Sequence, residues 1–305
     1  MFVIDYRYFY DALENCKSSY LLPEILYQIS DLKQLYGLDR NVAFFTNIGI
    51  SQVSDININK FYEKLYKIFN NEPLKIFTAK HGCNTFDYLL NLMISFQNKV
   101  EYFMIIIYQD NNIHFDPKIK SIYDKLSVSK ELCKPLNKTR YGIYFTGGYS
   151  IYLISKYNKS NIKIIDTSFI FEFTNGFNPN KNSLGYNYLL SNINLSMIDY
   201  IKANANGSFQ GDVIENDFLS KLDIPYFSVK GYVGDSLTNS GVENCFIFDK
   251  IVNHNVIPKT YNCDVPLSSN ILIDDIILDN KYVIFLSLFK SLFGMCSYTI
   301  FKIRR

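Results

Sequence analysis

The chain has 305 residues, enough for one large domain or two fused lobes around a sizeable apolar core. Its formal net charge of +2 is nearly neutral, which argues against a nucleic-acid-binding surface, and the basic end at 301–305 is short enough to be a solubilising tail. The first twenty residues lack a basic start and a long apolar run. The most apolar stretch, 282–295, is interrupted by Lys290 and is too short to cross a bilayer. We therefore expect a soluble, cytoplasmic protein that binds neither nucleic acid nor membrane.

The apolar pattern of the first half predicts helices and strands in alternation. A helix is expected at 21–36, a strand at 41–49 and a second helix at 56–69. A third helix starts near Asn84 and is followed by a strand at 100–108. The face of that third helix is apolar, with Phe86, Leu89, Leu90, Met93 and Phe96.

The second half continues this alternation to the end of the chain. Strands are expected at 141–155, 161–173, 197–203, 226–232, 270–278 and 298–303, and helices at 184–194, 212–222 and 237–253. Strands that are apolar on both faces and alternate with helices indicate a layered α/β fold. The order of elements also repeats, which predicts two pseudo-duplicated halves, 1–132 and 133–305, with a seam near 127–138. Because no Pro- or Ser-rich linker separates them, we expect the halves to share one core.

The cysteines and histidines show no spacing typical of a disulfide framework or a metal site. They stand at Cys16, Cys83, Cys133, Cys245, Cys263 and Cys296, and at His81, His114 and His254. The pattern indicates reduced thiols and no bound metal.

A polar corner follows the strand at 197–203, in the stretch "MIDYIKANANGS" at 197–208. Such strand-to-corner transitions are where α/β enzymes expose catalytic side chains. Here the corner offers Asn204 and Asn206, which cannot carry a proton near neutral pH. Taken alone, both asparagines are more typical of an ordinary turn than of a functional site.

Four segments of the second half resemble the β-ketoacyl synthases of the thiolase-like superfamily. They are "CKPLNKTRYGIYFTGGYSIYLI" (133–154), "IDYIKANANGSFQGDVIEN" (198–216), "FSVKGYVGDSLTNSGVEN" (227–244) and "HNVIPKTYN" (254–262). The second is similar to the family motif I-D-Y-[IV]-N-A-H-G-T-G-T, and the third to S-[ST]-K-[SG]-x-x-G-H. The resemblance implies a thiolase-like αβαβα fold of two related halves, with a shortened N-terminal half.

The resemblance also assigns the positions of a catalytic site that this chain has largely lost. The family uses a cysteine at a helix N-terminus, two histidines and a lysine. The lysine is retained as Lys230, whereas Asn204 and Asp235 stand where the histidines would be. The helix phase favours Gly82 at the nucleophile position, and one deletion would place Cys83 there instead.

These substitutions predict a site that cannot perform decarboxylative condensation. An amide cannot relay a proton, and a carboxylate opposes the negative charge that develops in the reaction. The alternative is that Lys230 and Asp235 form a routine surface ion pair and that Cys83 is a small core residue.

The family includes inactive homologues, the chain-length factors, which pair with an active ketosynthase in type II polyketide and polyene systems. The resemblance therefore implies a non-catalytic partner that heterodimerises with an active ketosynthase and shapes its acyl tunnel in polyketide, polyene or fatty acid synthesis. Leu292, at the family's gating Phe position, is a candidate tunnel residue. No cofactor of its own is expected, and an acyl carrier protein would deliver acyl-phosphopantetheine to the complex.

Two other functions remain open from the sequence. One is an acyltransferase of ketosynthase fold that uses Cys83, because acyl transfer needs no decarboxylation. The other is a stand-alone, non-catalytic protein that binds an acyl carrier protein.

Overall fold

The computed structural model describes residues 1–12, 15–38, 42–47, 55–71, 74–79, 84–96, 100–109, 125–172, 183–236, 241–291 and 294–305. In its first half the elements run in the order β1 (Phe2–Ala12), α1 (Ser18–Tyr36), β2 (Val42–Asn47), α2 (Asp55–Ile68), β3 (Lys75–Thr78), α3 (Thr85–Ile94), β4 (Tyr102–Gln109) and β5 (Thr146–Ser155).

The second half repeats this order with two insertions, the short helix α7 and the strand pair β9–β10. It runs β6 (Ile162–Phe171), α5 (Leu184–Leu190), β7 (Tyr200–Lys202), α6 (Gly211–Leu219), β8 (Tyr226–Phe227), α7 (Lys230–Val233), α8 (Gly241–His254), β9 (Val256–Ile257), β10 (Ile276–Ile277), β11 (Tyr282–Lys290) and β12 (Met295–Arg304). The short strands β9 and β10 pair only with each other in a separate sheet of the described residues.

The remaining strands of the described residues form a ten-stranded sheet in the order β3-β2-β4-β5-β1-β6-β12-β11-β7-β8. Read outward from the β1–β6 junction, the two halves match strand for strand. β2 lies parallel to β3 and β4, as β7 lies parallel to β8 and β11. β4 and β5 are antiparallel, as are β11 and β12. The chain is therefore a duplicated α/β fold, as the sequence predicted.

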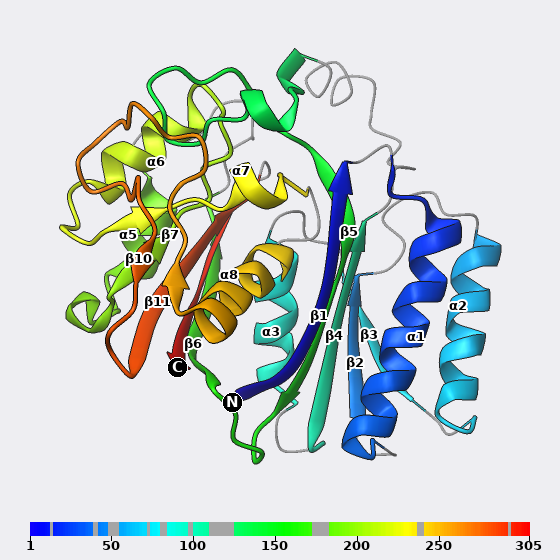
Figure 1. The fold of residues 1–305 in the computed structure, drawn as a ribbon. Helices are drawn as coiled ribbons and strands as arrows, with labels where there is room; N and C mark the ends of the chain where they lie inside the picture. Colours follow the sequence, from blue (N-terminus) through cyan, green and yellow to red (C-terminus); the bar gives the residue numbers. More distant parts are fainter. Residues whose placement is uncertain are drawn as a thin grey trace.

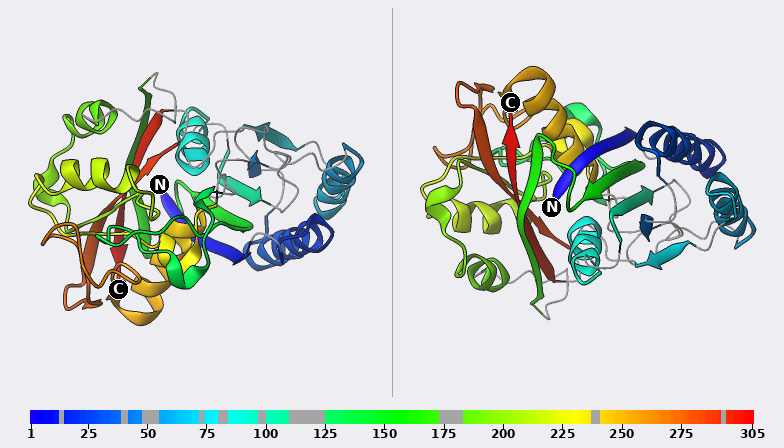
Figure 2. Two further views of the ribbon diagram at one scale, coloured as in Figure 1. Left: turned by 90° about the horizontal axis from the view of Figure 1, so that it is seen from above. Right: turned by 90° about the horizontal axis from the view of Figure 1, so that it is seen from below.

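The two half-sheets are joined by little pairing and are separated by helices. Among the described residues, the ladder between β1 and β6 consists of the pairs Phe2–Lys163 and Val3–Ile162. Seen from above and below, α3 and α8 lie between the half-sheets, α1 and α2 cover one outer face, and α5 and α6 cover the other (Figures 1 and 2). This is the helix–sheet–helix–sheet–helix layering that the resemblance implied.

Three apolar clusters fill the spaces between these layers. The central cluster joins α3 and α8 to strands of both halves, including Phe45 and Phe285. The second places α1 and α2 on β2, β4 and β5, and the third places α5 and α6 on β7, β11 and β12. Helix α1 packs on the sheet because its apolar residues recur at helical spacing, so that Leu21, Ile25 and Leu32 fall on one buried face.

Most expected elements are present, and the exceptions have local causes. The strand predicted at 226–232 ends at Phe227, because Lys230–Val233 turns into the short helix α7. Of the strand expected at 270–278, Ile276–Ile277 forms β10, and Ile271 forms an isolated parallel bridge with Tyr226. Among the strands of the ten-stranded sheet, β1, β3 and β11 were not expected. β1 is rich in Tyr and mostly half-buried, β3 has only four residues, and β11 lies in the apolar stretch 282–295 that was considered only as a possible membrane span.

The change from one half-sheet to the other occurs between β5 and β6, at 156–161. The expected seam at 127–138 lies upstream of this point, because β5 belongs to the first half-sheet. As a division into folding units, 1–132 and 133–305 stays a prediction. In the part of the chain described above, no helix is long and apolar enough to span a membrane.

Candidate functional site

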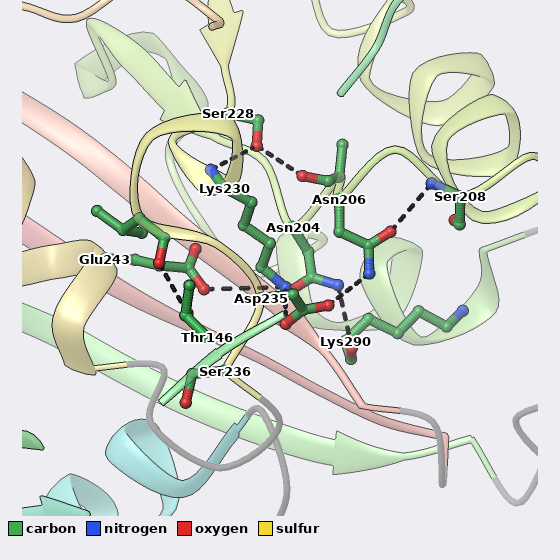
Figure 3. A network of polar contacts seen from close by, with 12 residues as sticks. Thr146, Asn204, Asn206, Ser208, Ser228, Lys230, Asp235, Ser236, Glu243 and Lys290 are labelled. Carbon is green, nitrogen blue, oxygen red and sulfur yellow. Dashed lines mark hydrogen bonds and ion pairs between the residues drawn. The ribbon is translucent and has the colours of Figure 1, made fainter. Parts of the chain in front are cut away.

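The residues that the motifs singled out meet where β7, β8 and β11 end. Asn204 follows β7, Lys230 begins α7 just after β8, and Asp235 follows α7 (Figure 3). These are the carboxyl ends of parallel strands, where α/β folds gather functional side chains. The structure therefore brings Asn204, Lys230 and Asp235 together as the sequence predicted.

Lys230 lies at the centre of this site and is almost completely buried. Its side chain is 1% exposed, and its Nζ donates to Asn204 Oδ1 and to Asp235 Oδ1, each at 3.0 Å. A third oxygen, Glu243 Oε1, lies 3.8 Å from the same nitrogen. The Lys230–Asp235 pair is thus buried, and the surface ion pair considered from the sequence is excluded.

The amide of Asn204 is held at both ends. Its Oδ1 accepts from Lys230, and its Nδ2 donates to the Lys290 carbonyl at 3.0 Å. Its backbone N–H donates to Glu215 Oε1 at 2.8 Å. These partners fix the side chain as a structural link between the strand ends, with no group that could shuttle a proton.

Asn206 belongs both to the turn and to the site. Its Nδ2 donates to Asp235 Oδ2 at 2.6 Å, while its backbone N–H and that of Gly207 donate to the buried carboxylate of Asp212. Gly207 has a φ of +93°, and a Cβ there would meet the Gly142 carbonyl oxygen. The backbone of the corner therefore forms a turn, and the Asn206 side chain contacts Asp235.

Asp235 is positioned by the backbone as well as by its ion pair. Its N–H donates to the Tyr144 carbonyl at 2.7 Å, and its carbonyl accepts from Thr146 N at 3.3 Å. The preceding Gly234 has a φ of +76°, and a Cβ there would meet the Thr146 side chain. The start of β5 therefore determines where the Asp235 carboxylate lies.

Two further charged residues, Lys202 and Glu243, extend the site inward and were missed from the sequence. Lys202 Nζ lies 2.7 Å from Glu243 Oε2, and the two side chains are 0% and 3% exposed. Lys202 also donates to the Leu288 carbonyl and lies over the Phe289 ring. The signal was present, because Lys202 replaces the Asn of the family motif and Glu243 is the one charged residue in the buried stretch 241–248 of α8.

Burial dominates the titration of the groups around the site. It raises the pKa of Glu215 to about 7 and raises that of Asp212, although backbone N–H donors oppose both shifts. Burial also lowers the pKa of Lys202, and the Glu243 carboxylate opposes that shift. Cys133, whose Sγ lies near the Asn206 carbonyl, has a pKa raised to about 12 by burial and is a poor nucleophile.

Gly82, Cys83 and Leu292 lie outside the described residues, so the choice between Gly82 and Cys83 stays open. The helix that follows them, α3, begins where it was expected. Its described apolar residues Phe86, Leu89, Leu90 and Met93 are buried, and Phe96 is partly buried.

Beside the start of α3 lies a second buried polar network that the sequence did not reveal. Asp87 accepts hydrogen bonds from Ser297, at 2.6 Å, and from Thr299. Asn84 donates to Ser297 and to the Phe289 carbonyl. Burial raises the pKa of Asp87 to about 6 despite its hydroxyl donors.

The site contains no described imidazole. Among the histidines, the described residues include His254, which is 56% exposed at the end of α8 and lies beside Asp249. Nor does any group of three or more His, Cys, Asp and Glu side chains among the described residues form a potential metal site. The five described cysteines are buried free thiols.

No protein-family model matches the sequence, and no curated protein matches it. Solved structures do match. A β-ketoacyl synthase from Burkholderia phymatum STM815 superposes with a TM-score of 0.71 at 14% identity, covering 92% of this chain and 81% of the other. A ketosynthase in complex with its chain length factor, from Xenorhabdus doucetiae, superposes with a TM-score of 0.72 at 15% sequence identity. The match covers 96% of this chain and 82% of the other.

A ketosynthase from module 1 of the bacillaene synthase of Bacillus amyloliquefaciens FZB42 superposes with a TM-score of 0.72 at 13% sequence identity. The match covers 93% of this chain and 62% of the other. This chain therefore spans less than two thirds of that longer ketosynthase. At these identities the superpositions establish the fold. The duplicated half-sheets, the central helices α3 and α8, and these superpositions together give the chain the thiolase-like fold of the ketosynthases.

Proposed function

We propose that this chain is a non-catalytic, ketosynthase-like subunit of the chain-length-factor type. It heterodimerises with an active ketosynthase and shapes the acyl tunnel of that partner in type II polyketide, polyene or fatty acid synthesis. An acyl carrier protein delivers the acyl-phosphopantetheine chain to the complex. Leu292 remains the candidate tunnel residue.

The observation that carries this proposal is that the polar side chains of the site are occupied by one another. Lys230 is neutralised by Asp235, and Asn204 is held between Lys230 and the Lys290 carbonyl. Condensation needs groups that move a proton and stabilise a developing oxyanion. A buried carboxylate and a fixed amide supply neither.

The solved structures of similar fold support the partner role. They include the ketosynthase complex with its chain length factor named above, and a structure titled as a keto synthase–chain length factor. Another is a type II polyketide acyl carrier protein in complex with its ketosynthase. Each of these describes another protein, and we extend the arrangement to this chain on the strength of the shared fold and the altered site.

Strand β3 is the edge through which we expect the partner to join the sheet. Among the described residues, β3 pairs on one side only, with β2. Ala79 N–H donates to Thr46 O on β2, so by alternation the N–H of Ile76 points away from β2. The superfamily dimerises by continuing one sheet across a two-fold axis, and this edge is suited to that contact.

The experiment is co-expression with an intact ketosynthase from the same genome. We expect the two proteins to co-purify, and we expect the complex, but not this chain alone, to form carbon–carbon bonds from an extender carried on acyl carrier protein. Ile76→Pro removes the outward N–H of β3 without removing a β2 hydrogen bond, and it should abolish co-purification. Ile277→Pro is the matched control, because its N–H also points outward, from the separate strand β10.

Three results would contradict the proposal. Condensation by this chain alone would show an active enzyme. Acyl loading that disappears in Cys83→Ala would favour the acyltransferase. A soluble chain that binds acyl carrier protein but never the ketosynthase would favour the stand-alone binder.

A further inference from the structure

Lys202, Glu243, Lys230 and Asp235 form one buried series of alternating charge. The three successive nitrogen–oxygen distances are 2.7, 3.8 and 3.0 Å, and no side chain in the series is more than 5% exposed. The series begins on β7, passes through α8 and α7, and ends just after α7. Its members Glu243, Lys230 and Asp235 are shown in Figure 3. Its formal charges sum to zero only when Asp235 is present.

Within this series, the two oxygens of Asp235 each receive a different donor. Oδ1 accepts from Lys230 Nζ at 3.0 Å, and Oδ2 accepts from Asn206 Nδ2 at 2.6 Å. The two donors therefore form a fork that matches a carboxylate, with one N–H for each oxygen. Removal of Asp235 would leave two ammonium groups facing the Glu243 carboxylate, and a buried cation without a counter-charge is strongly unfavourable.

The fork is held independently of Asp235. Lys230 also donates to Asn204 Oδ1. The backbone of Asn206 is tied to Asp212, which in turn accepts from the backbone N–H of Leu136. The donors would thus stay in place if the Asp235 side chain were shortened.

We infer that Lys230 and Asn206 form a carboxylate-binding site that the chain fills with its own Asp235 side chain. Asp235 is a built-in ligand, and its presence closes the site to a free carboxylate or a carboxylated substrate. This inference goes beyond the proposed partner role, and it is tested on the isolated chain without a ketosynthase.

The test is rescue by formate, which has the size of the group removed in Asp235→Ala. We expect the thermal midpoint of Asp235→Ala to lie well below that of the wild type. It should rise by about 2 °C when formate reaches ten times its dissociation constant, at constant ionic strength maintained with sodium chloride. The wild type should show no such rise, because its site is full.

Two matched variants isolate the cause. Asp235→Asn keeps the space filled and should not respond to formate. Asp235→Ala combined with Lys230→Met leaves space but no cation, and it should not respond either. Propionate should act more weakly than formate on Asp235→Ala, because it exceeds the space vacated.

A folded Asp235→Ala that ignores formate would overturn the inference, as would an equal response of wild type and variant. If Asp235→Ala does not fold by itself, refolding with and without formate gives the same comparison. Failure to recover folded protein in formate would then overturn the inference.

Discussion

Helices α3 and α8 occupy equivalent places in the two halves, and each buries a carboxylate in its first turn. Asp87 is the acidic residue in the first turn of α3, and Glu243 is the one in the first turn of α8. Both helices lie in the central layer between the half-sheets (Figure 2), and both side chains are buried. Their partners differ in kind, because Asp87 faces the hydroxyls of Ser297 and Thr299, whereas Glu243 faces the ammonium groups of Lys202 and Lys230.

The difference shows two ways to bury an acid at one position of a duplicated fold. Hydroxyl donors satisfy the Asp87 oxygens but do not offset the loss of solvation, so its pKa rises to about 6. Cations offset that loss directly, but they tie the carboxylate to two other buried charges. The α8 arrangement should therefore be sensitive to charge removal and the α3 arrangement sensitive to pH.

The largest effect is expected for Glu243→Gln. It leaves Lys202 buried without its counter-charge and should lower the free energy of unfolding by about 3–5 kcal/mol, measured by urea denaturation. The double variant Lys202→Met, Glu243→Leu replaces the pair by apolar groups and should lie closer to the wild type. A loss below about 1 kcal/mol in Glu243→Gln would remove the distinction between the two helices.

The second largest effect is expected on the pH dependence of the free energy of unfolding, through Asp87. Its folded pKa of about 6 exceeds the ordinary value of 3.8, so the native state holds this proton to higher pH than the unfolded chain. The contribution of Asp87 to the free energy of unfolding is therefore full below pH 4 and is lost as pH rises to about 6. The loss is on the order of 3 kcal/mol.

Asp87→Asn should remove this part of the pH dependence. Urea denaturation from pH 4 to pH 8 should show the variant gaining stability relative to the wild type as pH rises through this interval. If the difference between the two proteins is independent of pH, Asp87 is not protonated as we expect.

The smallest effect compares two serines. Ser297→Ala removes a donor to the Asp87 carboxylate and should cost about 2 kcal/mol near neutral pH, because hydrogen bonds to charged groups are the stronger ones. Ser287→Ala removes a donor to the neutral Asn244 amide beside Glu243 and should cost about 1 kcal/mol. Equal costs, measured at pH 8, would indicate that Asp87 is neutral there.

The apolar period predicted the layered α/β fold, because it reflects local geometry, and the resemblance to the ketosynthase motifs implied that Asn204, Lys230 and Asp235 meet in one site. The sequence did not reveal Lys202 or Glu243 as site residues, because their contact joins a strand to a helix 41 positions away in the chain. Asp87 was missed for the same reason, since its donors lie on β12. Single charges within apolar segments were the available signal, and each needed a partner that no local pattern identifies.

β1 was missed for a different physical reason. Its side chains are only partly buried and alternate weakly, although it lies between β5 and β6 in the sheet. Its position depends on pairing with β5, where Tyr8 lies opposite Ser150. Such long-range pairing leaves little trace in a local hydrophobic pattern.

That pairing also constrains how the protein can be made. During synthesis β1 is translated before its neighbour β5, with α1 to α3 and β2 to β4 between them. Until Ser155 leaves the ribosome, β1 lacks the strand with which most of its residues pair, so its edges can meet another extended chain. This interval therefore favours aggregation, and a chaperone that covers the unpaired strand would counter it.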